Sequence, residues 1–467
     1  MPILGLIGTE SFAANRFKSA RRKVFYDYPN GAAPLVGLTS MLKEERCSDP
    51  EFNWFEKRWF GGVSATASGG TAPWYGSGAG VDNSWGTTER NTVVNITQGQ
   101  KVTIRVADGT VFRVGQVIRV KDIALTAGGP QTVQFRIAQM TLATGTQYYL
   151  DCYVLQTPSS TFTVANNTGK EVLAIGSANS QGARSQGLSG YTLPVNPTNV
   201  TQIFRTPFSI SRTAMKTSAK YDPSGVWKDR SKEASVTHMT EIEYAFFLGQ
   251  RYSDLTGVTD GGVGQPVYYT AGIYHFLQAW EAAGADAAFN DFADYRGASA
   301  AAVTLNTDDN KRIVAPTGGI LTEKDYDGYT ERCFRVTMST DNSKLAFCGN
   351  GFLNVINQLY KSKGVLNADL PMTETYGMDV VAHRCPFGKI YYKTHPLFNL
   401  NPNLRNSAVF MDVGNILYRY IDDTDLLENR QENDADYRKD EWLTECGLEF
   451  RYPESFMWFD NVLDFAP

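Results

Sequence analysis

The sequence predicts an α+β protein with an added β-rich domain. Between Thr92 and about Gly176, short runs of β-branched and aromatic residues alternate with polar ones and are separated by glycine turns. Helical spacing of apolar residues appears only after this region, and a second series of strand-like segments closes the chain. Strands followed by helices and then by paired strands are typical of the α+β class.

Residues 1–60 are expected to form an extended N-terminal arm. The arm contains turn-forming Pro, Asn and Gly residues and ends in an aromatic block at 52–60, which includes Trp54 and Trp59. Large aromatic side chains beside a glycine-rich segment cannot form a core alone. We therefore expect this block to pack on a distant part of the chain or on another chain.

Residues 61–90 are expected to form a long binding loop. They hold eight glycines together with Trp74, Tyr75 and Trp85. A flexible linker would normally lack tryptophan, because Gly and Ser dominate such linkers. Glycine freedom combined with aromatic anchors is more typical of a loop that contacts a partner.

The remaining elements follow from the spacing of apolar residues. Strands of the β-rich domain are predicted at 102–106, 111–114, 117–120, 132–137, 148–155 and 161–164. Helices are predicted at 231–250, 271–284 and 351–362. The closing strands are predicted at 379–383, 389–393, 407–412, 416–421 and 443–452.

Charge is distributed unevenly along a chain whose net charge is only −5. Residues 422–445 hold ten acidic and three basic side chains, whereas the arm carries a short basic run that includes Arg16, Arg21, Arg22 and Lys23. Such asymmetry suits a protein that meets copies of itself or a charged neighbour, although a solvated surface remains an alternative for each run. The arm leaves nonspecific contact with DNA open, but no dedicated DNA-binding domain is indicated.

No pattern of residues predicts catalysis, a metal site or a cofactor. None of the four histidines has the spacing of a metal motif, and His383 and Cys385 are expected to lie two apart on a strand without the contact that a catalytic dyad needs. The glycine-rich segment 76–80 lacks the ending of a phosphate loop, and 325–328 lacks the remaining ligands of a calcium loop. We therefore expect a protein that is not an enzyme.

The cysteines and the hydropathy of the chain indicate where the protein is made. The six cysteines form no CxxC pair, which indicates buried reduced thiols made in a cytoplasm. The first residues lack a basic segment ahead of an apolar one, and no apolar run approaches the ~18 residues of a membrane span. A soluble protein without a membrane partner is expected.

Seven segments then occur in a characteristic order: PLVGLTSML at 34–42, DPEFNWFE at 49–56, DGTVFRVGQVIRV at 108–120, NVTQIF at 199–204, EIEYAFFLG at 241–249, FCG at 347–349 and TYGMDVVAHR at 375–384. In this order the chain resembles the tailed-phage major capsid proteins with the Hong Kong 97-type fold. The resemblance implies an N-terminal arm, an extended loop, a peripheral domain with a long spine helix, and an axial domain. It places them at 1–60 (arm), 61–215 (extended loop and β-rich insertion), 216–264 (spine helix of the peripheral domain), 265–425 (axial domain) and 426–467 (strands returning to the peripheral domain).

The same resemblance implies a function in assembly. Hexamers and pentamers of the chain would form the icosahedral shell of a virion around double-stranded DNA, after assembly in the cytoplasm of the host bacterium. A separate scaffolding protein, a portal and a decoration or cement protein are the implied partners, with DNA touching the inner face nonspecifically. The contacts between subunits are expected to be non-covalent and to involve Arg16, Arg21, Arg22, Lys23, Trp54, Trp59, Trp74, Tyr75 and Trp85.

Two other functions remain open on the sequence alone. A tail or baseplate subunit would also be a self-assembling structural protein, but it would form tubes or small rings. A carbohydrate-binding or hydrolytic β-protein could use Trp74, Tyr75 and Trp85 as stacking platforms, although no suitable pair of carboxylates accompanies them. For the capsid hypothesis, deletion of 61–90 is expected to leave a folded subunit that cannot assemble.

Overall fold

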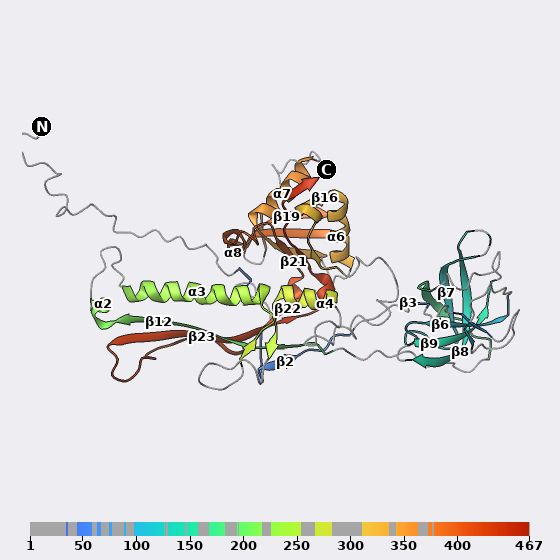
Figure 1. Ribbon diagram of the computed structural model, residues 1–467, viewed down its shortest axis with the longest axis horizontal. Coiled ribbons are helices and arrows are strands. Elements are labelled where there is room, and N and C mark those ends of the chain that lie inside the picture. The colour runs from blue at the N-terminus through green and yellow to red at the C-terminus, as the bar shows by residue number, and fades with distance from the viewer. Residues whose placement is uncertain are drawn as a thin grey trace, which may run out of the picture.

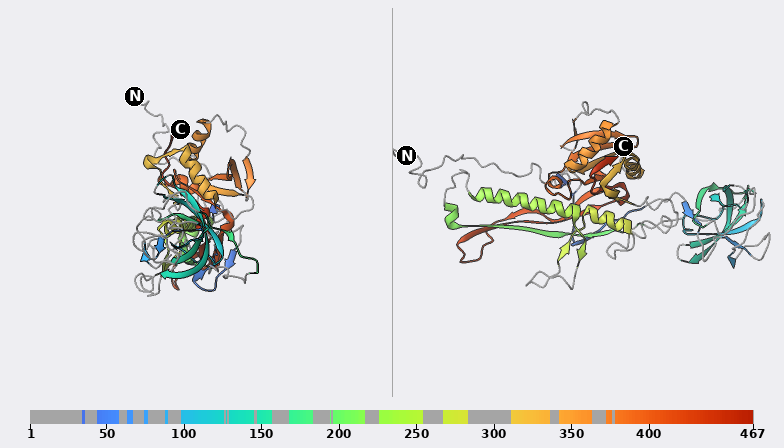
Figure 2. Two further views of the ribbon diagram at one scale, coloured as in Figure 1. Left: turned by 90° about the vertical axis from the view of Figure 1, so that its right-hand side faces the viewer. Right: turned by 45° about the horizontal axis from the view of Figure 1, so that its top comes forward.

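The computed structural model of the protein describes residues 34–35, 44–57, 63–66, 74–76, 88–89, 98–125, 127, 129–144, 147–156, 168–182, 194, 196–216, 226–253, 267–282, 311–335, 342–362, 372–375 and 378–466. Their elements fall into three parts. A central sheet lies under a long helix, a mixed α/β unit lies above them, and a β-domain lies at one end of the long axis (Figure 1). The view tilted by 45° also shows the β-domain apart from the other two parts (Figure 2, right).

The central part is a four-stranded sheet covered by one long helix. Its strand order is β1 (Glu44–Arg46), β22 (Ile416–Leu427), β23 (Tyr437–Phe450) and β12 (Gln202–Ser211). β1 runs parallel to β22, whereas β23 pairs antiparallel with both β22 and β12. The short α2 (Arg212–Lys216) follows β12, and α3 (Val226–Leu248) then runs back along β12 and β23 (Figure 1).

The helix and the sheet bury each other because their apolar faces match. In α3, the residues Ala234, His238, Ile242 and Phe246 are four apart, so they form one stripe, and all of them are buried. In β12, buried residues are spaced four apart at 204 and 208, which places both on the same face of the strand.

The β-domain is an antiparallel sheet that closes on itself. Its strand order is β3 (Val63–Ala65), β10 (Glu171–Ser177), β7 (Gln116–Ile123), β8 (Gln131–Thr144), β9 (Gln147–Val154), β6 (Lys101–Val106), β4 (Trp74–Gly76) and β5 (Thr88–Glu89). Thr66, next to β3, bridges to Val106 of β6, and the amide of Ala107 donates to the carbonyl of Ala65 at 2.8 Å. The strands from β3 to β6 therefore form a small barrel with its own buried core.

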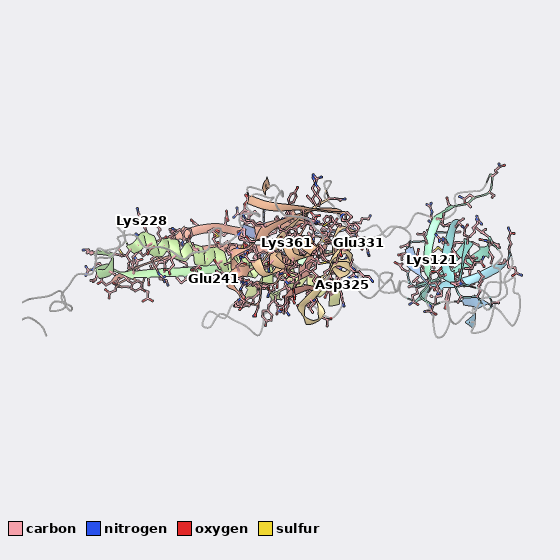
Figure 3. All side chains as sticks on the ribbon, turned by 90° about the horizontal axis from the view of Figure 1, so that it is seen from above. Lys121, Lys228, Glu241, Asp325, Glu331 and Lys361 are labelled. Atoms are coloured by element: carbon pink, nitrogen blue, oxygen red, sulfur yellow. The ribbon has the colours of Figure 1, made fainter. Side chains whose placement is uncertain are left out.

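The mixed unit is a seven-stranded sheet with helices packed on it. The strand order is β15 (Ile313–Val314), β24 (Met457–Phe459), β21 (Ala408–Met411), β17 (Ser343–Cys348), β20 (Gly388–Thr394), β19 (Met378–Cys385) and β18 (Met372–Thr375). The helices are α4 (Ile273–Ala282), α6 (Glu323–Arg335), α7 (Asn350–Ser362) and α8 (Pro396–Leu400), with 3₁₀ turns at Thr317–Gly319, Val413–Asn415 and Pro453–Ser455. Seen from above, Asp325, Glu331 and Lys361 lie over this unit, whereas Lys121 lies in the β-domain (Figure 3).

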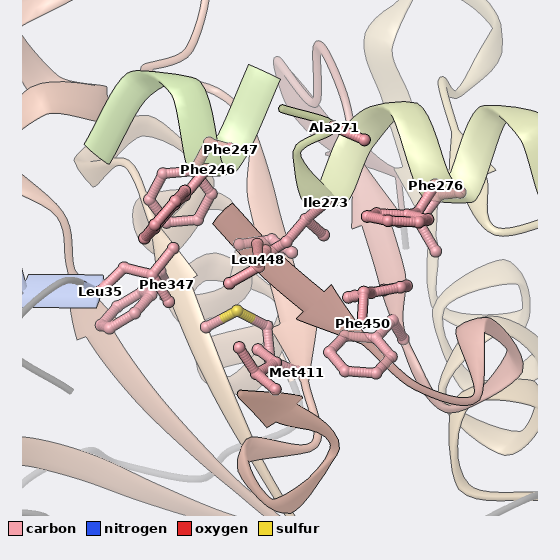
Figure 4. Packing of buried hydrophobic residues seen from close by; sticks show 14 of the residues in the cluster. Leu35, Phe246, Phe247, Ala271, Ile273, Phe276, Phe347, Met411, Leu448 and Phe450 are labelled. Carbon is pink, nitrogen blue, oxygen red and sulfur yellow. The ribbon is translucent and has the colours of Figure 1, made fainter. Parts of the chain in front are cut away.

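Three short strand pairs complete the fold, and two of them, the first and the last named here, join segments that are distant in sequence. They are β2 (Glu51–Asn53) with β11 (Thr198–Val200), β13 (Tyr252–Ser253) with β14 (Tyr268–Tyr269), and β16 (Ile320–Thr322) with β25 (Asp464–Ala466). The first pair fixes the arm to the chain that leaves the β-domain. One hydrophobic cluster then connects the arm, α3, α4 and the closing strands, with Leu35, Phe247, Phe347, Met411 and Phe450 among its members (Figure 4).

Most predicted elements are confirmed. The three predicted helices correspond to α3, α4 and α7, and the strand predictions at 102–106, 117–120, 132–137 and 148–155 correspond to β6, β7, β8 and β9. The closing strands appear as β19, β20, β21, β22 and β23. The strand predicted at 161–164 lies outside the described residues.

One predicted strand is wrong, and one helix was not predicted. Residues 111–114 form a turn between β6 and β7 instead of a strand, because the amide of Phe112 donates back to the carbonyl of Gly109. Residues 325–328, considered only as an incomplete calcium loop, belong to helix α6. The hydroxyl of Thr322 accepts a hydrogen bond from the amide of Asp325 and donates one to the carboxylate of Asp325. Such a side-chain cap starts a helix.

The glycine-rich segment 61–90 is not a loop throughout. Its described residues form β3, β4 and β5, and all three belong to the sheet of the β-domain. β3 supplies the contacts that close the barrel. Deletion of 61–90 would therefore open the barrel. This corrects the expectation that the deletion leaves the subunit folded.

Strand pairing also crosses two of the expected segment boundaries. β12, within 61–215, pairs along its whole length with β23, and the boundary at 425 falls inside β22. β24 and β25, within 426–467, pair with strands of the mixed unit instead of the central sheet. These crossings arise because the partner strands are not consecutive in the chain, and β12 and β23 lie more than two hundred residues apart, which no local pattern reports.

Candidate assembly surfaces

The end of the arm is built into the body of its own chain. Trp54 is 4% exposed, and its ring lies 6.1 Å from that of Phe276 on α4. Its indole Nε1 donates to Glu56 Oε1 at 2.7 Å, and the same oxygen accepts from the amide of Tyr452 at 3.2 Å. Trp54, expected to contact another subunit, therefore packs inside its own.

A second anchor joins the arm to α3 and to the mixed unit. The carboxylate of Glu243, buried on α3, accepts from the amide of Leu35 at 2.8 Å and lies 2.7 Å from Nε2 of His395. The rings of Phe247 and Phe398 flank His395 at 5.1 and 4.8 Å. One buried carboxylate thus ties three parts of the chain together.

An ion-pair network holds strand β1 of the arm against the central sheet. Arg419 of β22 lies 2.6 Å from Glu45 of β1 and 2.5 Å from the buried carboxylate of Glu449 on β23. Arg451 pairs with Glu449 as well. Because Glu449 is buried between two guanidinium groups, its charge is compensated, and the arm is fixed at the open side of β22.

Phe55 is the aromatic residue of the block that faces outward. It is 70% exposed, whereas Phe52, Trp54 and Glu56 are buried. The alternation is that of an extended chain with one face on the body, and the apolar Phe55 beside the polar Glu56 conceals it in the sequence. Phe55 is therefore a contact candidate that the sequence reasoning missed.

The other expected contact residues are only partly placed. Trp74 and Tyr75 lie in β4, whose backbone pairs with β5 and β6, so both belong to the β-domain. Trp59, Trp85 and the basic residues of the arm (Arg16, Arg21, Arg22 and Lys23) lie outside the described residues.

The acidic segment forms the hairpin of β22 and β23. Its exposed acidic side chains are Asp422, Asp423, Asp425, Glu428, Glu432, Asp434 and Asp436. Asp440 is the buried member, where it accepts from the amide of Asn429 at 2.9 Å and lies 2.8 Å from Nη2 of Arg438. Arg438 also lies 4.6 Å from the ring of Trp227, so the hairpin is held against the start of α3.

The shifted pKa values of His383 and Cys385 indicate structural roles for these side chains. Burial raises the pKa of the Cys385 thiol to about 12 and lowers the pKa of His383, so the neutral forms of both are favoured over a thiolate–imidazolium pair. All six cysteines are free thiols. Within the described residues, no group of three or more acidic, His or Cys side chains could hold a metal, and no helix is long and apolar enough to cross a membrane.

Comparison with known families decides the identity of this chain. The model of the SU10 major capsid protein family matches residues 24–463. The chain belongs to this family. Because the match includes the arm, the β-domain and both sheets, it does not rest on a single shared domain.

Relatives of the SU10-family chain are distant in sequence. The major capsid protein of Pseudomonas phage PaMx41 is 22% identical over 408 residues, which cover 87% of this chain and 79% of that protein. Among solved structures, the SrpI encapsulin complex of Synechococcus elongatus PCC 7942 matches with a TM-score of 0.37 at 8% identity, over 58% of this chain and 78% of that one. The structure of Mycobacterium phage Adephagia matches with a TM-score of 0.37 at 8% identity, over 95% of this chain and 92% of that one. The cyanophage Pam1 capsid matches with a TM-score of 0.33 at 11% identity, over 62% of this chain and 81% of that one.

As a member of the SU10 family, the chain is a phage major capsid protein. It is a structural subunit, not an enzyme, and copies of it form the capsid shell of the virion. The capsid function predicted from the resemblance is therefore confirmed, and the described residues show the mixture of helices and sheets of the predicted α+β class.

Proposed function

We propose that the subunit forms rings of six and rings of five, and that these rings close an icosahedral shell around double-stranded DNA. The observation that supports this best is the β-domain, which holds a closed core of its own at the far end of an elongated subunit. A part with its own core adds little to the stability of the rest of the chain. Its role is therefore contact with neighbouring subunits.

We assign the parts of the subunit as the resemblance implies. Residues 1–60 are the arm, 61–215 the extended loop with its β-rich insertion, 216–264 the spine helix of the peripheral domain, 265–425 the axial domain and 426–467 the returning strands. Two strands depart from these ranges. β12 lies within 61–215, but its pairing with β23 supports counting it with the peripheral domain; β24 lies within 426–467, but its pairing with β21 supports counting it with the axial domain.

Contacts between neighbouring subunits are proposed at both ends of the molecule. The candidates are Trp74 and Tyr75 of β4 in the β-domain, the exposed Phe55 of the arm, and Trp59 and Trp85, which lie outside the described residues. The basic residues of the arm, Arg16, Arg21, Arg22 and Lys23, suit an acidic neighbour such as the exposed face of the β22–β23 hairpin in a second subunit.

Other partners follow from the same proposal. A separate scaffolding protein, a portal and a decoration or cement protein would join the shell during or after its assembly in the host bacterial cytoplasm. With a net charge of −5, the chain repels DNA on average, so contact with packaged DNA is nonspecific and limited to local basic segments.

Electron microscopy of the purified chain, concentrated alone and with the scaffolding protein of the same phage, tests the proposal. The expected result is closed shells in which three-dimensional reconstruction resolves rings of six and five. Tubes or stacked small rings would instead identify a tail or baseplate subunit. Nuclease-protected DNA inside particles from infected cells would support the genome-enclosing role, and its absence from mature particles would refute that role.

A further inference from the structure

Strand β8 of the β-domain extends beyond its neighbour on one side. β7 pairs with β8 as far as Arg136, which lies opposite Val117. From Gln139 to Leu142, β8 pairs with β9 on the other side, and no described strand pairs with its outer edge. Alternate backbone groups of this stretch therefore point away from the sheet.

This outer edge carries neither a charge nor a proline to protect it, and irregularities in its pairing with β9 occur only before Gln139 and after Leu142. No charged residue and no proline occur between Ile137 and Leu150. Gln139 and Thr141 are exposed, and Leu142 is 58% exposed. Edge strands usually carry Lys, Pro or an inward charge to prevent pairing with other chains, so an uncharged edge with an exposed Leu indicates a strand that is covered in the assembled state.

The absence of charge also indicates which partner covers the edge. Copies of this chain form the shell, and an icosahedral shell contains two-fold axes. When a strand pairs antiparallel with its own copy across a two-fold axis, the residue on the axis faces itself, and each residue next to it lies diagonally close to the same residue of the copy. Any charge near the axis would therefore come close to the same charge, which destabilises the pair, whereas an uncharged strand pairs with itself freely.

We propose that the Gln139–Leu142 edge of β8 pairs antiparallel with the same edge of a second copy, across a two-fold axis of the shell. The inference rests on the proposed icosahedral assembly and names one of its contacts. Four residues at ~3.3 Å each give a contact of ~13 Å, which is weak alone. It becomes effective because a closed shell repeats it at many positions.

Ile175 on β10 provides a matched control in the same barrel. It is 53% exposed, close to the value for Leu142. It lies on another strand, at a bulge of β10 beyond the end of β3, and outside the Gln139–Leu142 edge. A charge at this position alters the apolar surface of the barrel without altering the proposed contact.

The test compares the full-length variants Leu142→Lys, Leu142→Glu and Ile175→Lys under conditions in which the wild type forms shells. Each Leu142 variant is expected to raise the subunit concentration at which shells form by roughly five- to tenfold, because two like charges are then brought close together near the axis. An equal mixture of the Lys and Glu variants is expected to return most of the way to the wild-type value. Ile175→Lys is expected to behave as the wild type, and all variants are expected to keep the wild-type thermal unfolding profile.

Three results would overturn the inference. The Leu142 variants could assemble as well as the wild type, the mixture could fail to recover, or Ile175→Lys could impair assembly equally. A failure of the mixture would mean that another molecule covers the edge. All three results leave the shell function intact, whereas a wild type that never forms shells would refute the proposed function itself.

Discussion

At the scale of single residues, the buried histidine His238 shows how the fold selects one protonation state. Nδ1 lies 2.9 Å from the hydroxyl of Thr206, and Nε2 lies 2.8 Å from that of Thr444. A hydroxyl can donate or accept, so a neutral imidazole satisfies both contacts. Burial lowers the pKa of His238 from 6.5 to about 4, which keeps the ring neutral between α3 and the sheet.

Acid is therefore expected to loosen the packing of α3 on the central sheet. Between pH 6.5 and 4 the unfolded chain binds a proton at His238 more readily than the folded chain does, so stability falls as the pH falls through this window and levels off below it. The contribution is up to about 3 kcal/mol. Urea unfolding of the subunit at several pH values measures it.

The variant His238→Gln isolates this contribution from other titrating groups. An amide retains a donor and an acceptor for the two threonine hydroxyls but does not titrate. The difference in unfolding free energy between pH 7 and pH 4 is expected to be smaller in this variant than in the wild type. An equal difference in both proteins would mean that His238 does not sense the pH.

Glu243 allows a second prediction at this scale. Glu243→Ala removes the acceptor for the amide of Leu35 and the partner of His395, and it leaves both polar groups buried. We expect the unfolding free energy to fall by about 2–4 kcal/mol. Limited proteolysis is expected to release the arm earlier than in the wild type.

Glu241, two residues earlier on the same helix, is the control. It is exposed on α3 (Figure 3), and its carboxylate has a 3.4 Å contact with the hydroxyl of Thr206. Glu241→Ala is expected to leave both stability and arm cleavage close to those of the wild type. Equal effects of the two substitutions would contradict the anchoring role of Glu243.

The sequence predicted that the aromatic block packs on another part of the protein, but it did not predict which of its side chains face inward. The aromatic block was expected to dock on a distant part of the chain or on another chain, and Trp54 does pack on Phe276, far along the sequence. Which aromatic side chains face inward depends on the extended conformation of 51–56, whose alternation buries Trp54 and exposes Phe55. Composition alone does not contain that information.

At the scale of elements, local periodicity predicted helices and strands that carry a strong apolar stripe. It missed α6, although Tyr326, Thr330, Cys333 and Phe334 have helical spacing, because a polar Asp-rich start concealed the pattern. It also gave no strand at β12, where Pro207 interrupts the pattern. Proline is tolerated there because β12 is the edge strand of its sheet.

Gly447 on β23 lies where the β2–β11 pair packs too closely for a side chain. A Cβ at this position would lie 2.8 Å from Cε1 of Phe52 and 2.8 Å from the carbonyl oxygen of Val200, so a side chain would collide with both strands of the β2–β11 pair. Gly447→Ala is expected to lower the unfolding free energy by about 1–3 kcal/mol and to displace the arm. Thermal unfolding and arm proteolysis measure the two effects.

Gly129 serves as the comparison for this substitution. A Cβ built there meets nothing within 4 Å. Gly129→Ala is therefore expected to leave the thermal midpoint nearly unchanged. If Gly447→Ala were equally harmless, β2 would not be held as closely over β23 as its position indicates.

At the scale of the whole molecule, the chain joins units with separate cores. The barrel of the β-domain has its own cluster of buried apolar residues, while a second cluster runs from Leu35 through α3 and α4 to Trp458. The sequence predicted the β-domain because its strands are consecutive. It could not predict that β12 pairs with β23 or that β1 pairs with β22, because these partners meet only after long loops close.

The separate cores lead to a last prediction, that the β-domain can be removed without unfolding the body. Asn53 of β2 pairs with Thr198 of β11, so the chain enters and leaves the β-domain at neighbouring points. We expect that replacing 58–195 with about six Gly and Ser residues, which span up to ~20 Å, leaves both sheets of the body folded. The excised segment is expected to unfold cooperatively when expressed alone, because its barrel closes without any strand from the body.

Deletion of 61–90 alone provides the contrast that makes this prediction sharp. That change removes β3, which bridges β10 and β6, and leaves the rest of the barrel open with its core exposed to water. Calorimetry is expected to show one lost transition for both deletions, but only the shorter deletion is expected to bind a hydrophobic dye and to aggregate. Electron microscopy is expected to find neither variant in normal shells, because each lacks a folded β-domain for its neighbours. Normal shells from the replaced chain would show that the β-domain is an appendage and not part of the assembly contacts.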